Sequence, residues 1–156
     1  IKAARVLMAA GIPLVICQGH AESAVVRAAA GEEIGTRFIA REQPHEITPR
    51  KLWIALGDAA RGALVVDDGA KRALIERGSS LLSVGIVRVE GRFDDGDIVD
   101  VKDESGHLFA RGRTAFSSDE VDLSCGRGRE ELERNRLLSA FADKPVIHRD
   151  DLIAFE

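Results

Sequence analysis

The stretch that decides the fold is residues 50–101, RKLWIALGDAARGALVVDDGAKRALIERGSSLLSVGIVRVEGRFDDGDIVDV. Near its centre, Asp67 or Asp68 can cap a short helix, because a side-chain oxygen there accepts a hydrogen bond from a free backbone amide. Gly78 and the two serines that follow predict the end of this helix, since glycine adopts left-handed backbone angles without strain. The apolar positions that share one helix face are Ala70, Ala73 and Leu74.

Beyond Gly78 the hydrophobic pattern changes from the helical period to the period of a strand. Between residues 87 and 93, Val87, Val89 and Phe93 alternate with charged side chains, which predicts a strand with one buried face. Asp95-Gly96 predicts a turn, residues 98–102 a return strand, and residues 108–116 a third strand broken by a glycine. Short strands with frequent turns indicate a small barrel or sandwich.

The remaining C-terminal residues predict short helices and one closing strand. Ser117-x-x-Glu120 matches a capping box, in which each side chain bonds the backbone amide of the other residue. Residues 129–138 carry mixed charges at helical spacing, and residues 145–148 are expected to form the last strand.

Residues 2–39 have a different organisation, with the predicted order helix, strand, helix, strand. Residues 2–10 have helical periodicity, residues 13–17 are a continuous apolar run, and residues 21–30 form a second helix before a strand near residues 35–39. Such short apolar runs are typical of parallel strands buried on both faces. Because two parallel strands cannot cover both of their own faces, we expect further strands from a region upstream of this segment.

Ordered landmarks in the chain resemble the PUA domain at the C-terminus of bacterial glutamate 5-kinases. They are Lys51-x-Trp53-Ile54, Val66-Asp67-x-Gly69-Ala70, Gly78-x-Ser80-Leu81-Leu82, Gly85-Ile86 and Gly96-Asp97, followed by Ser118-Asp119 and Ile147-His148-Arg149-Asp150-Asp151. The resemblance implies an α/β fragment, the end of an amino acid kinase fold, followed by a mainly-β PUA pseudobarrel with short helices. It places the kinase remnant at residues 1–48, a linker at 49–60 and the PUA domain at 61–153.

The resemblance also implies an activity that lies outside this chain. Glutamate 5-kinase transfers a phosphoryl group from ATP to the side-chain carboxylate of L-glutamate in proline biosynthesis, with Mg²⁺ and with proline as feedback inhibitor. The glutamate and ATP sites of the family lie in the missing N-terminal region, and its phosphate-binding lysine falls upstream of Ile1. We therefore expect no catalytic, cofactor-binding or metal-binding residue here, an inactive fragment, and a homo-oligomer in the full-length form.

Bulk composition is that of a soluble globular protein with an excess of acid. The net charge of -4 argues against a strongly basic, non-specific nucleic-acid binder. The two cysteines match neither a zinc spacing nor a disulfide framework, which indicates a reducing cytoplasm. No apolar run approaches the ~20 residues that span a bilayer, so we expect no membrane association.

Three further motifs invite a chemical interpretation, and each has a simpler structural one. Residues 126–129, Gly-Arg-Gly-Arg, could cradle a phosphate but lack the Walker and Rossmann patterns, so a turn is favoured. Residues 148–151 could supply a general base or metal ligands, yet a strand would point alternate side chains apart. Cys17 and His20 could form a nucleophile and base, but no orienting acid is identifiable, which favours a packed core cysteine.

The alternative to a kinase fragment is a stand-alone PUA module that binds RNA and has no kinase activity. PUA domains of RNA-modifying enzymes bind RNA in a groove beside their first helix. The cations at corresponding positions are Lys71, Arg72, Arg111 and Arg113, which could position a phosphate backbone. Few aromatic residues are available for base stacking, and acidic residues crowd the same region.

Overall fold

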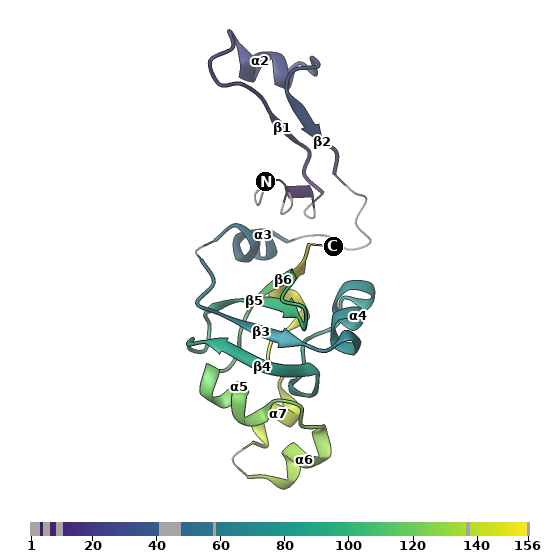
Figure 1. The fold of residues 1–156 in the computed structure, drawn as a ribbon, viewed down its shortest axis with the longest axis vertical. Coiled ribbons are helices and arrows are strands. Elements are labelled where there is room, and N and C mark those ends of the chain that lie inside the picture. Colours follow the sequence, from purple (N-terminus) through teal and green to yellow (C-terminus); the bar gives the residue numbers. More distant parts are fainter. Residues whose placement is uncertain are drawn as a thin grey trace. The chain divides into compact units, whose positions relative to one another are not determined.

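The computed structural model describes residue 4 and residues 7–8, 11–40, 48–57, 59–136 and 138–155 of the 156-residue chain. The chain divides into two compact units, Ile1–Ile47 and Thr48–Glu156. Each unit has its own sheet, with two strands in the first and five in the second (Figure 1).

The first unit is a two-stranded ribbon whose connecting segment contains a short helix. Strand β1 (Leu14–Ile16) pairs with β2 (Thr36–Phe38), and helix α2 (Ala24–Ala29) lies between them in the chain. The pairing is antiparallel, so the predicted parallel arrangement is wrong. Gly35 explains the difference, because its φ of 68° and lack of a side chain let the returning chain lie against Ile16 and Cys17 at the end of β1. The helix predicted at residues 2–10 falls largely outside the described residues.

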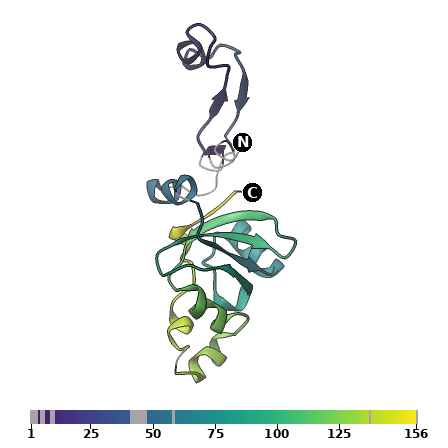
Figure 2. The ribbon, with the colours of Figure 1, turned by 60° about the vertical axis from the view of Figure 1, so that its left-hand side comes forward.

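The second unit is built on a five-stranded mixed sheet in the order β4-β3-β5-β6-β7. Its strands are β3 (Gly62–Val66), β4 (Ile86–Gly91), β5 (Ile98–Asp103), β6 (Leu108–Arg113) and β7 (Leu152–Ala154). Its helices are α3 (Pro49–Leu56), α4 (Asp68–Arg77), α5 (Ser118–Ser124), α6 (Arg129–Arg134) and α7 (Ala140–Asp143), with single 3₁₀ turns at Ser83–Gly85 and Arg149–Asp151. Helices α5, α6 and α7 gather at one end of this unit, and α4 lies apart from them (Figures 1 and 2).

Strand β3 lies in the interior of the sheet, and the sequence reasoning missed it. It pairs antiparallel with β4 and parallel with β5, so residues 98–102 do not return against residues 87–93 as predicted. The apolar run from Ala63 to Val66, between Gly62 and Asp67, carried the sequence signal of a fully buried strand. The Asp95-Gly96 turn does form, with Gly96 at a φ of 90°.

The two edges of the sheet also depart from the simple alternating pattern. In β4, Ile86 is paired with Val66 and Arg88 with Val65, so Val87 sits in a bulge and is 47% exposed instead of buried. The last strand is β7, whereas residues 145–148 were predicted to form it. Ile147 instead makes an isolated antiparallel bridge to Leu81, because the chain crosses from α7 to the segment after α4 before it joins the sheet.

Local signals at the helix ends are confirmed. Asp67 caps α4, Gly78 ends it in the left-handed region, and Ser117 and Glu120 form the predicted capping box of α5. Helix α3 occupies most of the segment predicted as a linker, because Thr48 caps it and Ile54 is fully buried. One core fills this unit, with Phe109, Leu64, Val99 and Val101 completely inaccessible to solvent.

Candidate functional site

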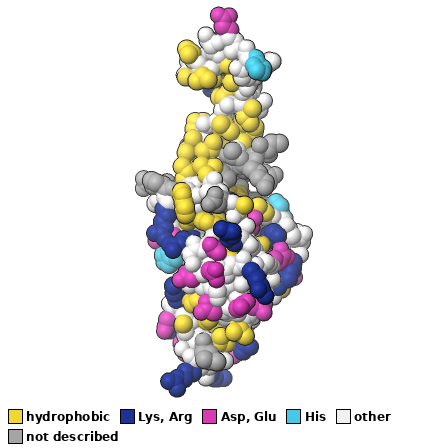
Figure 3. Space-filling view, turned by 90° about the vertical axis from the view of Figure 1, so that its left-hand side faces the viewer, with side chains coloured by type: hydrophobic (Ala, Val, Ile, Leu, Met, Phe, Trp, Pro, Cys, Tyr) yellow, Lys and Arg dark blue, Asp and Glu magenta, His cyan; other side chains and the backbone are white. Residues whose placement is uncertain are grey.

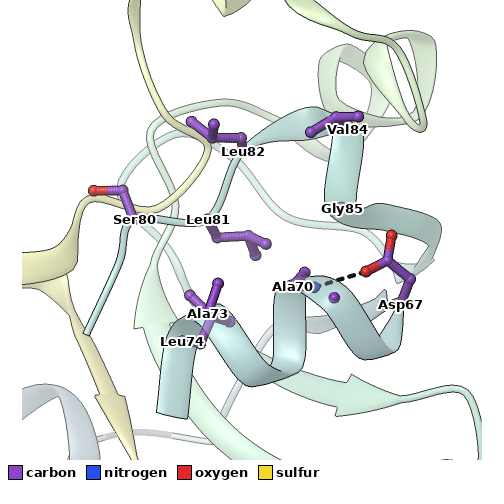
Figure 4. Close-up of a pocket in the computed structure, with 10 residues that line it drawn as sticks. Asp67, Ala70, Ala73, Leu74, Ser80, Leu81, Leu82, Val84 and Gly85 are labelled. Atoms are coloured by element: carbon purple, nitrogen blue, oxygen red, sulfur yellow. Dashed lines mark hydrogen bonds between the residues drawn. The ribbon is translucent and has the colours of Figure 1, made fainter. Parts of the chain in front are cut away.

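A groove opens between helix α4 and the segment that follows it, residues 80–85; we call it the α4 groove. Its volume is about 300 Å³. One wall consists of the α4 side chains Ala70, Ala73 and Leu74. The other wall consists of Leu81, Leu82 and Val84, and Figure 4 shows both walls.

Sequence features on both walls fix the width of the α4 groove. The Asp67 side chain accepts a 2.7 Å hydrogen bond from the Ala70 amide and so sets the first turn of α4 (Figure 4). Gly85 lies directly against this turn, and a Cβ added to it would come within 2.5 Å of the Ala70 Cβ. Residues 70 and 85 must therefore both be small for the two walls of the α4 groove to lie this close together.

The chemistry of the α4 groove is that of an apolar binding surface. Leu82 and Val84 are each 52% exposed, so both present apolar surface to solvent beside the groove. The polar groups at its rim are already bonded, since Asp67 caps α4 and the Ser80 hydroxyl accepts a hydrogen bond of 2.9 Å from the Arg149 amide. The groove can hold an apolar or flat group, and no nucleophile and base converge within it.

The two predicted RNA-contacting cations on α4 lie next to each other but differ in their environment. Lys71 forms a 2.9 Å ion pair with Asp103, and its ammonium lies 5.2 Å from the centre of the Phe109 ring. Arg72 is exposed and donates a weak hydrogen bond to the Asp68 carbonyl oxygen at 3.3 Å. Arg72 thus keeps most of its charge available to solvent, whereas Lys71 is engaged with a carboxylate.

The two predicted cations on β6 are also divided between engaged and available. Arg111 donates to Asp100 at 2.8 Å and to the Ala55 carbonyl oxygen at 3.4 Å, and is partly buried. Arg113 is exposed and donates to the Gly96 carbonyl oxygen at 3.1 Å. Arg72 and Arg113 line separate hollows, so the four residues do not form one continuous groove lining. Their role in RNA binding stays a prediction.

The Asp103 side chain stabilises the turn between β5 and β6 and binds the ammonium group of Lys71. Its carboxylate accepts hydrogen bonds from the Ser105 hydroxyl at 2.5 Å and from the His107 amide at 2.9 Å, in addition to the lysine. These donors, the Ser105 hydroxyl first and then Lys71, hold the pKa of Asp103 well below its usual range. The Asp103 carboxylate therefore stays charged and keeps Lys71 in place.

The other motifs singled out in the sequence take structural positions. His148 caps the 3₁₀ turn Arg149–Asp151, so residues 149–151 do not have the extended backbone that would point alternate side chains apart. In the Gly-Arg-Gly-Arg segment, Arg127 pairs with Glu131 at 3.0 Å and Arg129 with Glu133 at 2.7 Å.

The two cysteine sites show no sign of activation. No hydrogen bond joins Cys17 to His20 in the part of the chain that the structure describes. Burial, with a smaller effect of Asp122, raises the pKa of Cys125 to about 11, so this thiol stays protonated at neutral pH. Among the described residues, no base is hydrogen-bonded to Cys17, and the raised pKa makes Cys125 a weak nucleophile at neutral pH.

The described residues contain neither a candidate metal centre nor a candidate membrane-spanning helix. No group of three or more histidine, cysteine or acidic side chains in residues 11–40, 48–57, 59–136 and 138–155 is placed to hold a metal ion. Within the same described parts, none of the helices is long and apolar enough to cross a bilayer.

Comparisons with known proteins identify the second unit and relate the whole chain to one enzyme family. The PUA domain model matches residues 62–135. Glutamate 5-kinase from Caldanaerobacter subterraneus subsp. tengcongensis is 41% identical over 156 residues, which is 100% of this chain and 41% of that relative. Residues 62–135 thus match the PUA domain family, and the whole chain is similar in sequence to glutamate 5-kinases. The predicted resemblance and the PUA fold are thereby confirmed.

Other matches are of the same kind. Glutamate 5-kinase from Shewanella sediminis is 39% identical over 153 residues, which is 98% of this chain and 40% of that relative. The chain thus spans about two fifths of the length of these glutamate 5-kinases. A crystal structure of a PUA domain from Aeropyrum pernix, in complex with tartrate, is 29% identical, covers 57% of this chain and 41% of that one, and gives a TM-score of 0.41.

The match to the PUA domain begins at the start of β3 and includes both walls of the α4 groove. It ends at Asn135, yet the sheet continues, because Ile147 bridges Leu81 and β7 pairs with β6. The residues after the matched range therefore complete the same PUA sheet.

Proposed function

We propose that this chain forms the C-terminal portion of a glutamate 5-kinase, in which its PUA domain is an accessory or regulatory module. The observation that carries the proposal is the 41% identity to a glutamate 5-kinase over the whole chain, including the first unit as well as the PUA domain. An enzyme of this family transfers a phosphoryl group from ATP to the side-chain carboxylate of L-glutamate, as a step of proline biosynthesis.

The reacting groups of that enzyme are assigned outside this chain. Phosphoryl transfer requires cations on the phosphates and a magnesium ion held by acidic ligands. The proposal places these groups in the N-terminal region of the full-length enzyme, and no step of the reaction is assigned to the residues of this chain. In this proposal residues 1–48 belong to the kinase domain, residues 49–60 connect it, and residues 61–153 form the PUA domain.

The proposal includes the partners and setting of the complete enzyme. ATP, Mg²⁺ and L-glutamate bind the kinase domain, proline acts as feedback inhibitor, the enzyme is cytoplasmic, and kinase domains associate into a homo-oligomer. The PUA domain acts through its surface, for which the α4 groove, with its exposed Leu82 and Val84, is the candidate contact.

The experiment compares the complete protein that contains this chain with a version ending at residue 60. The complete protein is expected to hydrolyse or transfer ATP only when glutamate is present and to be inhibited by proline. The truncated version should keep glutamate-dependent turnover with altered regulation. Absence of glutamate-dependent turnover in the folded complete protein contradicts the kinase assignment.

RNA binding by the PUA domain is the second candidate, favoured by the groove beside α4 and by the exposed Arg72 on the same helix. Phosphate contacts release counterions, so RNA affinity must fall steeply as salt increases. A titration of labelled RNA, repeated at several salt concentrations and with Arg72→Gln, measures this. If no RNA binds, or if the affinity changes neither with salt nor with Arg72→Gln, RNA binding through α4 is ruled out.

A further inference from the structure

The five-stranded sheet of the second unit buries side chains on both of its faces. Leu64 of β3 belongs to the main core, whereas its neighbour Ala63 is buried outside that core. Because side chains alternate along a strand, Ala63 points to the opposite face, which we call the second face of the sheet. Asp100, Arg111 and Ile153 follow Ala63 in one row across β5, β6 and β7, so their side chains share the second face.

Helix α3 covers the part of the second face that β6 and β7 form. It lies against these two strands and against the 3₁₀ turn Arg149–Asp151 (Figures 1 and 2). Ile54 of α3 is completely inaccessible to solvent and Ala55 is buried, and neither residue belongs to the main core. The helix therefore has a small buried contact of its own, separate from the core that fills the rest of the unit.

An arginine attaches each end of α3 to the sheet or to the turn before β7. Arg50, in the first turn of the helix, forms an ion pair with the largely buried Asp151. In the last turn, the Ala55 carbonyl oxygen accepts a hydrogen bond of 3.4 Å from Arg111. Carbonyls in the last turn have no partner within a helix, and a cation beside them is favourable. Because the Arg111 guanidinium also donates to Asp100 at 2.8 Å, one side chain joins α3, β5 and β6.

These docking contacts are what keep α3 helical. The helix has eight residues, and isolated helices of this length are unstable in water. On its outer side, Trp53 and Leu56 are exposed. Helix formation and docking of α3 are therefore coupled, so the segment loses its helical structure when it leaves the second face.

The position of α3 in the chain separates it from the core of the PUA domain. The helix ends before residue 62, where the match to the PUA domain begins. Two of the elements that it contacts, the 3₁₀ turn Arg149–Asp151 and β7, come after the end of that match at Asn135. The segments before and after the matched range thus hold each other. A contact of this kind can open without unfolding the main core.

We propose that α3 is a latch, which docks on the second face and opens as a unit while the main core stays folded. Docked, α3 is part of the PUA domain; open, its residues become connecting chain. A helix rises 1.5 Å per residue and an extended chain about 3.3 Å, so opening of eight residues lengthens the connection from about 12 Å to as much as about 26 Å. The latch thereby regulates the length and freedom of the segment that precedes the PUA domain, and Arg111 holds it closed. This role does not depend on the assignment to a kinase.

Native-state hydrogen exchange of the whole chain, followed by two-dimensional amide NMR at low urea concentrations, tests the latch. The amides of residues 53–57 should be protected at least about tenfold less than those of residues 63–66 in β3, and their exchange should change little with urea because the opening exposes little surface. Arg111→Gln should lower the protection of α3 relative to β3 by a further factor of about ten or more, through loss of a hydrogen bond from a charged group. Lys102→Gln is the matched control, because it removes a β5 cation that pairs with Glu90 at 2.7 Å, and it should leave this ratio unchanged.

Trp53, the only tryptophan of the chain, gives a second readout of the same opening. Its fluorescence anisotropy should fall at a lower urea concentration than the one at which the amide signals of β3 disappear. Ile54→Ala removes the buried contact from the α3 side and should act like Arg111→Gln, which separates the latch from an effect of Arg111 on β5 alone.

Three results would overturn the latch. The first is equal protection of α3 and β3 amides in the wild type, which means that the helix opens only when the whole domain unfolds. The second is an absence of protection in α3, which means that the helix is not docked in solution. The third is an equal change of α3 and β3 in both Arg111→Gln and Ile54→Ala. The β3 amide signals of each variant show whether the main core is folded.

Discussion

Replacing Gly112 by alanine tests how the PUA sheet is closed. Gly112 lies in β6, opposite Val99 on one side and Leu152 on the other. An added Cβ would lie 2.6 Å from the Cγ2 atom of Ile147 and 3.0 Å from the Asp151 carbonyl oxygen. The segment between Ile147 and Asp151 can cross β6 this closely only because residue 112 has no side chain.

The expected cost follows from two opposing effects. Overpacking a well-filled core costs about 1–3 kcal/mol. Alanine recovers roughly 0.5–1 kcal/mol, because it loses less backbone freedom than glycine on folding. We therefore expect Gly112→Ala to lower the free energy of unfolding by about 1–2 kcal/mol, or to lower the melting temperature by roughly 4–16 °C for a domain of this size.

Urea unfolding followed by far-ultraviolet circular dichroism measures this change, with the m-value expected to stay constant. Gly19→Ala is the control, because its backbone angle is unstrained and nothing lies within 4 Å of the added Cβ. In an Ile147→Ala background the close methyl contact is gone, so the cost of Gly112→Ala should fall by about 1 kcal/mol or more. An equal cost in both backgrounds, or a stabilised single variant, would refute the close-packing argument.

Three further predictions concern the helix ends and the partly buried thiol of Cys125. Asp67→Ala should lower the free energy of unfolding by about 1 kcal/mol in urea, because the first turn of α4 loses its cap, and Asp67→Asn should retain most of the stability. Hydrogen bonds from Ser117 lower the pKa of Glu120 below 4.5. The stabilising effect of the Glu120 carboxylate is therefore complete above pH 4.5 and is lost as the pH falls through the lowered pKa. Glu120→Gln should unfold more easily at pH 7, and its stability should depend less on pH between pH 5 and 3. Burial and Asp122 raise the pKa of Cys125 from 9.0 to about 11, so at pH 8 iodoacetamide should modify it about 100-fold more slowly than in urea; equal rates contradict this environment.

Local features of the PUA domain were predictable because neighbouring residues determine them. Asp67 caps a helix through an amide three residues ahead, Gly78 ends the same helix, and Ser117 pairs with Glu120 across one turn. Each of these interactions is complete within a few residues of chain. Because α4 was predictable from its cap, the helix that forms one wall of the α4 groove was predictable from the sequence.

Strand pairing could not be derived in the same way. Residues 62–66 had the composition of a buried strand, but their place between β4 and β5 depends on contacts with residues 86–91 and 98–103. The bulge at Val87 follows from the register of that pairing and reverses the burial that alternation predicts. Likewise, the antiparallel β1 and β2 depend on the close approach at Gly35.

The sequence by itself determined the helix caps and turns and, through its ordered landmarks, the PUA domain and its relation to glutamate 5-kinases. Tertiary structure alone decided which strands lie side by side and which segments cover the sheet. Arg50 and Asp151, like Ala55 and Arg111, are far apart in the sequence, and the packing of α3 on β6 and β7 brings each pair together. The physical reason is that caps and turns depend on short-range hydrogen bonds, whereas pairing and pockets depend on which distant surfaces bury each other.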